Sequence, residues 1–213
     1  MTEATTTVPT QMQSGIRVDL QLVADQIKPN SRVLDVGCGD GMLLAYLRDQ
    51  KKVDGRGLEL SMARVSGAVR EGLAVIQGDL DSDLKHYPEG AFDYAILSQT
   101  LQSTRNPKEV LEDLLRLGTY AVVSFPNFGH WRVRLELLLR GHMPSTPTLP
   151  ESWYDTENIH LCTIKDFLTL VDNMGVTIEA GFALDGHGKK VSYAATGWLA
   201  NLFSEQALFV LRR

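Results

Sequence analysis

The chain has 213 residues, of which 44% are hydrophobic and 22% charged, and its formal net charge is −5. This composition is typical of one globular domain, and the acidic balance disfavours a nucleic-acid-binding protein, which needs a concentrated positive patch. Two cysteines, Cys38 and Cys162, are too few for a disulfide framework, and neither lies in a Cys-x-x-Cys zinc motif.

The first residues differ in character from the rest of the chain. Residues 1–13 contain five threonines and little that a core would bury, which predicts a disordered leader. They lack the basic and apolar parts of a secretory signal, and no apolar run reaches membrane-spanning length, so we expect a cytoplasmic protein. Residues 14–213 are expected to form one domain, beginning with a helix over 14–28 that Ser14 caps.

Short apolar segments then alternate with amphipathic ones. The apolar segments predict strands over 32–36, 53–59, 73–77, 92–97 and 119–125, and the amphipathic segments predict helices over 42–49, 61–70 and 107–117. Nearly continuous apolar strands that alternate with helices indicate a parallel sheet covered on both faces. The predicted fold class is therefore α/β, doubly wound, with three αβα layers.

The pattern loosens after residue 125. Residues 126–162 contain a helical segment over 130–140 but are otherwise irregular and proline-rich, which predicts a cap or insertion. The regular pattern then returns, with a helix over 163–174 that Gly175 ends, and with strands over 176–184 and 207–211.

The strongest functional signal is a glycine-rich turn between the first strand and the next helix. Asp35 precedes Gly37, Cys38, Gly39 and Gly41, in the pattern Gly-x-Gly-x-Gly. A dinucleotide-binding loop would have its third glycine one residue later, and Asp35 would repel a pyrophosphate while suiting a cationic ligand. Glu59 follows Gly37 by 22 residues, at the end of the second strand, where a carboxylate can accept both hydroxyls of a ribose.

This loop resembles motif I of the class I S-adenosylmethionine-dependent methyltransferases. The resemblance implies a Rossmann-like, seven-stranded, mostly parallel sheet of order 3-2-1-4-5-7-6, with strand 7 antiparallel. It also implies that S-adenosylmethionine or S-adenosylhomocysteine is bound, with Asp79 accepting from the adenine amino group. The cofactor-binding residues expected on this basis are Asp35, Gly37, Cys38, Gly39, Gly41, Glu59, Leu60, Asp79, Leu80 and Ser98. A tight turn at the loop and a local cap at Asp79 are the alternatives without a ligand.

The segment after the fourth strand faces the methyl group and the substrate in that superfamily. Here it reads Ser98-Gln99-Thr100-Leu101, which contains no general base, so we assign no catalytic residue. Methylation of nucleobase amines is disfavoured because the Asn-Pro-Pro-Tyr and Asp-Pro-Pro-Tyr motifs are missing. Three histidines (His130, His142 and His160) have spacings that fit no compact metal site, so we expect none.

Two longer stretches carry a narrower resemblance. Phe-Pro-Asn-Phe-Gly-His-Trp over 125–131 and Trp-Tyr-Asp-Thr-Glu-Asn-Ile-His over 153–160, together with the glycine loop and 98–102, resemble the MetW family of methionine biosynthesis proteins. That resemblance implies an accessory or activating partner of homoserine O-acyltransferase (MetX). Such a regulatory subunit would bind S-adenosylmethionine and report the level of an end product to the pathway. The acidic balance and the lack of a long apolar run separately predict no nucleic acid and no membrane partner.

The alternative hypothesis is a true methyltransferase acting on an unidentified small molecule. Residues 126–162 would then cap the substrate, and the acceptor site would be lined by Gln99, Thr100, His130 and Tyr154. A protein or RNA methyltransferase is a weaker third hypothesis, because the acidic balance disfavours RNA.

Overall fold

The structure is a computed structural model that describes residues 16–146, 149, 152–156 and 158–213. The predicted leader over 1–13 and the predicted Ser14 cap lie outside these residues. Among the described residues, no helix is both long and apolar enough to cross a membrane.

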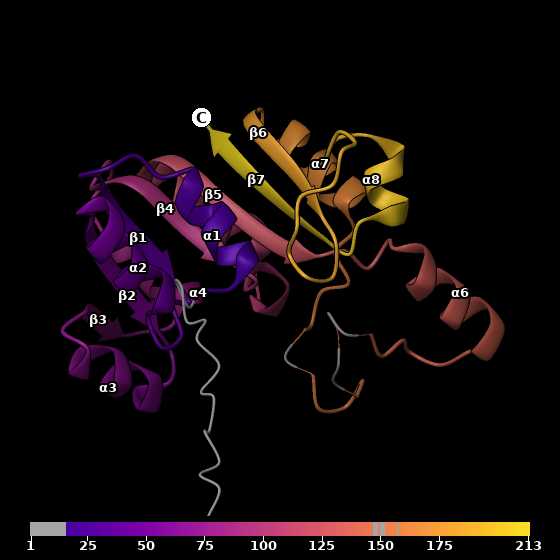
Figure 1. Ribbon diagram of the computed structural model, residues 1–213, viewed down its shortest axis with the longest axis horizontal. Coiled ribbons are helices and arrows are strands. Elements are labelled where there is room, and N and C mark those ends of the chain that lie inside the picture. The colour runs from indigo at the N-terminus through magenta and orange to yellow at the C-terminus, as the bar shows by residue number, and fades with distance from the viewer. Residues whose placement is uncertain (1–15, 147–148, 150–151, 157) are drawn as a thin grey trace, which may run out of the picture.

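Strands and helices alternate along the chain as the sequence predicts (Figure 1). The strands are β1 (Arg32–Val36), β2 (Asp54–Glu59), β3 (Ala74–Gln77), β4 (Phe92–Ser98), β5 (Gly118–Pro126), β6 (Thr177–Leu184) and β7 (Gln206–Arg212). The helices are α1 (Val18–Asp25), α2 (Met42–Lys51), α3 (Met62–Arg70), α4 (Leu80–Asp83), α5 (Pro107–Leu117), α6 (Trp131–Arg140), α7 (Ile164–Asn173) and α8 (Trp198–Phe203), with 3-10 turns η1 (Leu84–His86) and η2 (Leu101–Ser103).

The seven strands form one sheet, and this confirms the predicted architecture. Their order is β3-β2-β1-β4-β5-β7-β6, and β7 runs antiparallel to both β5 and β6. Val36 pairs with Leu58 on one side and with Leu97 on the other. The carboxyl ends of β1, β2 and β4 therefore lie level with one another, at the point where the strand order reverses. In an open α/β sheet this is the position at which ligands bind.

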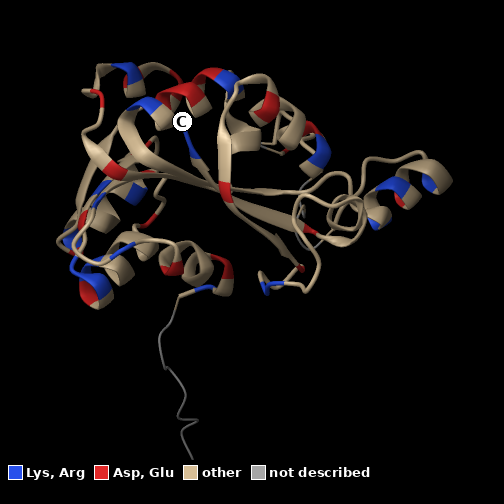
Figure 2. Cartoon of the chain, turned by 90° about the horizontal axis from the view of Figure 1, so that it is seen from above, with Lys and Arg blue, Asp and Glu red and all other residues tan. Residues whose placement is uncertain are grey.

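Helices cover both faces of the sheet, as the view from above shows (Figure 2). On one face, α5 and α7 pack on the central strands around three phenylalanines, with ring centroids 4.6 Å apart for Phe125 and Phe167 and 5.0 Å apart for Phe167 and Phe209. On the other face, α1 and α2 pack on the strands through Val23, Leu43 and neighbouring buried side chains. The central strands β1, β4 and β5 are therefore largely buried on both sides, which explains their nearly continuous apolar character.

Two short helices were not predicted from the sequence. The α4 helix has only four residues and no buried side chain, so it has no apolar face for a pattern to reveal. The α8 helix has six residues, fewer than two turns, and buries Ala200 alone. Elements this short depend on tertiary contacts and not on their own sequence.

One buried asparagine joins the end of β5 to two distant helices. The Asn127 side chain donates to the main-chain oxygens of Asn201 (3.0 Å) and Ser204 (2.8 Å) at the end of α8. Its Oδ1 accepts from the N–H groups of Gly129 (2.9 Å) and Ile164 (3.2 Å). All the hydrogen-bonding groups of this amide are therefore used, and they fix the start of the segment that leads into α6.

We expect Asn127→Ala to lower the free energy of unfolding by about 3 kcal/mol, because it leaves several buried main-chain groups without partners. Urea unfolding measures the loss. Asn106→Ala is the matched control, since Asn106 is exposed and its side chain forms no cap bond at the start of α5, so this variant should stay within about 0.5 kcal/mol of the wild type. Equal stability of the two variants would contradict this role of Asn127.

Candidate ligand-binding site

A cavity of about 650 Å³ opens at the carboxyl ends of the strands beside the reversal point. Among the residues predicted to bind a cofactor or substrate, those that line it are Gly37, Glu59, Leu60, Asp79, Leu80, Gln99 and Thr100. Four further lining residues could not be predicted, because they belong to no sequence motif that indicates ligand binding: Arg64, Asp81, Ser103 and Arg105. The strand ends thus bring together side chains from four separate segments.

The glycine loop adopts a backbone that other residues rarely take. Gly37, Gly39 and Gly41 have φ angles of +71°, +57° and +76°. A Cβ on Gly37 would lie 2.9 Å from Thr100 Oγ1, and one on Gly41 would lie 2.4 Å from Leu73 Cδ1. A Cβ on Gly39 would meet no protein atom within 4 Å. Packing therefore explains two of these glycines, whereas the space beside Gly39 holds no atom of the described residues. Five of the residues predicted to bind the cofactor are not among those that line the cavity: Asp35, Cys38, Gly39, Gly41 and Ser98.

Glu59 holds the loop against the neighbouring strand. Its Oε2 accepts from the N–H of Gly39 at 2.9 Å, and its Oε1 accepts from the N–H of Ser61 at 2.9 Å. The side chain is buried at the end of β2, where these two bonds compensate for the lost hydration of its charge. Because each carboxylate oxygen has a second lone pair, Glu59 can still accept from a bound polar molecule.

Asp35 is the last residue but one of β1, two residues before Gly37 of the cavity, and it does not line the cavity wall. It is 3% exposed. Burial, and after it the negative charge of Glu59, raises the pKa of Asp35 to about 7. Two acidic side chains this close favour a ligand that brings positive charge.

Cys38 belongs to the loop, but its thiol points into the protein interior. Its Sγ, together with Val75 and Leu44, converges on the space that a Cβ of Gly57 would occupy, where the sulfur would lie only 2.6 Å away. Burial raises the pKa of this thiol, so it stays protonated and is a poor nucleophile. Cys38 therefore contributes packing and main-chain atoms to the loop.

Asp79 already has two partners within the protein. Its Oδ1 caps α4 by accepting from the N–H of Asp81 at 3.0 Å, and its Oδ2 forms an ion pair with Arg105 Nη2 at 3.1 Å. The Arg105 side chain is 73% exposed, so the pair is easily disrupted. The local cap that the sequence offered as an alternative is present, and a ligand amino group would have to share this carboxylate with Arg105.

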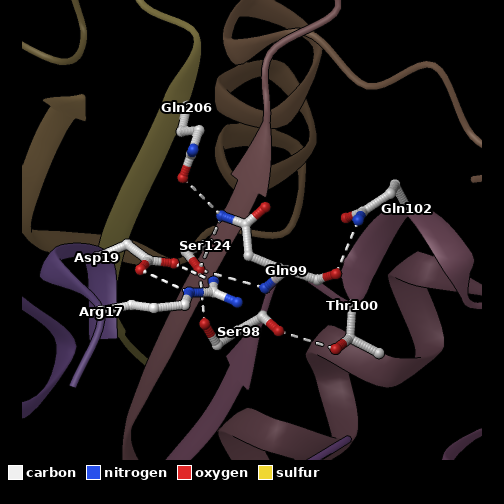
Figure 3. A network of polar contacts seen from close by, with 8 residues as sticks. All are labelled: Arg17, Asp19, Ser98, Gln99, Thr100, Gln102, Ser124 and Gln206. Carbon is white, nitrogen blue, oxygen red and sulfur yellow. Dashed lines mark hydrogen bonds and ion pairs between the residues drawn. The ribbon is translucent and has the colours of Figure 1, made fainter. Parts of the chain in front are cut away.

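The segment after β4 forms a network of amides and hydroxyls (Figure 3). The Ser98 and Ser124 hydroxyl oxygens lie 3.1 Å apart, and Thr100 donates to the Ser98 carbonyl at 2.9 Å. Gln99 has a φ of +55°, and its side-chain amide donates to Gln206 Oε1 at 3.1 Å. None of these groups takes up a proton readily near neutral pH.

Two of the predicted substrate residues lie elsewhere. His130 is buried, and its Nδ1 caps α6 by accepting from the N–H of Arg132 at 3.3 Å. Burial lowers the pKa of His130, so the ring is neutral. Tyr154 is exposed and packs edge-on against Trp153, with ring centroids 5.7 Å apart. Neither side chain lines the cavity beside Gln99 and Thr100.

The 3-10 turn η2, beside the cavity, is hydrogen-bonded to the irregular segment that follows α6. The Gln102 main-chain oxygen accepts from the N–H groups of Ile159 and His160, each at 3.0 Å. The Gln102 side chain donates to the Gln99 carbonyl at 2.7 Å (Figure 3). Residues 158–160 therefore rest on the same turn that carries Gln99, Thr100 and Ser103 of the cavity.

Solved structures with similar folds are S-adenosylmethionine-dependent methyltransferases and related proteins. A methyltransferase from Mesorhizobium loti has a TM-score of 0.67 and 18% identity, covering 94% of this chain and 100% of that one. The [4+2]-cyclase SpnF has a TM-score of 0.63 and 18% identity, covering 91% of this chain and 80% of that one. The chain thus has the Rossmann-like class I methyltransferase fold.

The sequence comparisons identify the family. The profile of the methionine biosynthesis protein MetW matches residues 17–211, and the chain belongs to this family. A curated relative from Rhodopirellula baltica, a bifunctional methionine biosynthesis protein MetXA/MetW, is 33% identical over 187 residues. The match covers 84% of this chain but only 30% of that protein, so the chain spans less than a third of its relative's length.

We expect the burial of Asp35 to give the protein a pH-dependent stability. The folded pKa of about 7 lies above the unfolded value near 3.9, so between these values the folded state binds more protons than the unfolded state. The contribution of Asp35 to the free energy of unfolding should therefore fall by on the order of 4 kcal/mol as pH rises from about 4 to 7. Above pH 7 it should level off.

Urea unfolding of the wild type and of Asp35→Asn across pH 4–8 measures this effect. The difference between the two proteins cancels the contribution of the other titrating groups. A constant difference across the whole range would show that Asp35 does not titrate in this way.

Proposed function

We propose that this protein binds S-adenosylmethionine or S-adenosylhomocysteine and acts as an accessory, activating partner of homoserine O-acyltransferase (MetX) in methionine biosynthesis. The observation that carries the proposal is the open glycine loop bonded to buried Glu59, opposite a segment that offers only amides and hydroxyls. Such a site is suited to hold a ligand and poorly suited to move a proton.

The residues present fit this ligand class. Glu59 would accept from the ribose hydroxyls, Asp79 from the adenine amino group, and Leu60 and Leu80 would flank the ring. The exposed main chain at Gly39 would face the amino-acid part, whose ammonium would be stabilised by the charges of Asp35 and Glu59. S-adenosylmethionine supplies an activated methyl group when it is bound, and the chain's own residues would only position it.

The MetXA/MetW relative supports the partnership with the acyltransferase. That relative is bifunctional, which indicates that it combines a MetXA part and a MetW part in one polypeptide. This chain matches 30% of the relative's length. Linking two proteins covalently raises their effective concentration toward each other, an arrangement that suits parts that act together.

A link between the cavity and the surface supports a regulatory role. The turn at Gln102 carries cavity residues, and its Gln102 main-chain oxygen accepts from the N–H groups of Ile159 and His160 in the irregular segment after α6. A ligand that favours one arrangement of this turn would change the surface that the segment presents. Regulation requires such a difference in affinity between two states, and the coupling is reciprocal.

The alternative function is methyl transfer to a small molecule. It draws support from the methyltransferases among the structures with similar folds. It requires an acceptor that needs no general base, because His130 and Tyr154 lie outside the cavity lining. Formation of S-adenosylhomocysteine from S-adenosylmethionine in the presence of an acceptor would favour this alternative function.

We expect Gly39→Val to abolish binding of S-adenosylhomocysteine, because the branched side chain would fill the space through which the ligand meets the main chain. Isothermal titration calorimetry measures the affinity. Gly90→Val is the matched control: Gly90 has a φ of +64° and an open Cβ position, so this variant has the same backbone strain, but in the turn before β4, at the amino ends of the strands. Wild-type affinity in Gly39→Val would contradict the assigned loop.

We expect the activity of purified homoserine O-acyltransferase from the same organism to rise when this protein is added. Titration with S-adenosylmethionine should change that activity at least about fivefold, the scale of typical allosteric coupling. With Gly39→Val, the activation should persist but should no longer depend on the ligand. An acyltransferase activity that is the same under all conditions would refute the proposal, and release of S-adenosylhomocysteine would favour methyl transfer.

A further inference from the structure

The α6 helix projects from the body of the molecule in both overall views (Figures 1 and 2). Among its residues only Val133 is buried. Four large apolar side chains lie along one side of this helix at the spacing i, i+4, i+7 and i+8, and all four are exposed: Trp131, Leu135, Leu138 and Leu139. We call this row the α6 stripe.

The α6 stripe turns apolar side chains to solvent, whereas a surface helix normally turns them to the core. An amphipathic helix turns its apolar side to the core and its polar side to water, whereas Leu138 and Leu139 are 79% and 72% exposed. Soluble proteins rarely leave a contiguous apolar row uncovered unless it binds something. Rows with this spacing are the anchors by which a helix fits into an apolar groove of a partner.

The charges of α6 indicate the character of that groove. The helix carries Arg132, Arg134 and Arg140 against Glu136 alone, on a chain whose net charge is −5. Glu136 is already paired with Arg140, at 3.1 Å, and the Arg132 guanidinium lies 5.5 Å from the centre of the Trp131 ring. The stripe therefore has a basic border, which complements an apolar groove with an acidic rim.

The same charges argue against a second copy of this chain as the occupant. A symmetric dimer through the α6 stripe would place one basic border beside another, with no unpaired acidic side chain on the helix to offset them. Like charges placed together at an interface oppose association. The 70% of the MetXA/MetW relative that this chain does not match leaves room for a large second part.

We propose, resting on the function proposed above, that the α6 stripe is the surface that docks into an acidic-rimmed apolar groove of homoserine O-acyltransferase. Trp131, Leu135, Leu138 and Leu139 are the anchors, and the arginines align the helix with the rim. The docking surface is joined to the ligand cavity, because Asn127 fixes the lead into α6 at the end of β5, the strand whose Ser124 main chain accepts from Gln99 at 2.9 Å.

The test compares three full-length proteins: the wild type, Leu138→Glu and Val69→Glu. Val69 is an exposed apolar residue of α3, outside the α6 stripe, so each variant adds one negative charge at an exposed apolar helix position. Surface plasmon resonance measures the affinity for purified homoserine O-acyltransferase, calorimetry measures the affinity for S-adenosylhomocysteine, and sedimentation measures the oligomeric state.

We expect Leu138→Glu to weaken acyltransferase binding at least tenfold and Val69→Glu to bind like the wild type. Affinity for S-adenosylhomocysteine should be equal in all three proteins, and wild-type binding to the acyltransferase should weaken as salt rises. Equal acyltransferase binding by Leu138→Glu and the wild type would overturn the α6 stripe while leaving the partnership intact. Absence of any complex with the wild type would instead overturn the partnership, and wild-type dimers that Leu138→Glu disrupts would assign the stripe to self-association.

Discussion

The bridge that Glu59 forms between Gly39 and Ser61 is the interaction on which the site depends. It links the glycine loop after β1 to the turn after β2, and the two strands already run in register, with Val36 beside Leu58. A loop with three positive φ angles would otherwise sample many conformations, because glycine restricts the backbone so little. The buried carboxylate selects one of them and leaves the main chain at Gly39 open. Burial of Asp35, and after it the negative charge of Glu59, raises the pKa of Asp35 behind this bridge.

The sheet could be predicted from sequence because each central strand is buried on both faces and is bounded by strong turn signals. The strand over 32–36 was predicted with its observed bounds, and the sheet order followed from the resemblance carried by the glycine loop. Side-chain partners could not be predicted in the same way. Asp79 meets Arg105, which lies 26 residues further along the chain, and His130 turns to cap α6 and not toward the cavity. The first contact depends on how separate elements pack, and the second is a local cap by a residue type that is not among the usual capping residues.

The stretches that resemble the MetW family have a common location in the fold. In the first of them, Asn127 joins β5 to α7 and α8, Gly129 fits closely against Asn201, and Trp131 begins the α6 stripe. In the second, Ile159 and His160 bond to Gln102 beneath the cavity wall. None of the described residues of either stretch lines the cavity. What the described part of these stretches contributes is the anchoring of α6 and of the segment that contacts Gln102.

The polar groups beside the cavity are consistent with the proposed binding role for a physical reason. Methyl transfer to an unactivated acceptor requires a nearby group that takes its proton, whereas the segment beside the cavity offers Ser98, Gln99 and Thr100, whose polar groups are already paired within the protein. The same hydrogen bonds link Gln99 to the sheet. A ligand that shifted Gln99 would disturb its bonds to Ser124 of β5 and Gln206 of β7, which are adjacent antiparallel strands. In the proposed regulatory role, such a disturbance would pass along β5, which leads from Ser124 to Asn127 and the start of α6. The ligand would then act by changing the surface that α6 presents, and not by giving up its methyl group.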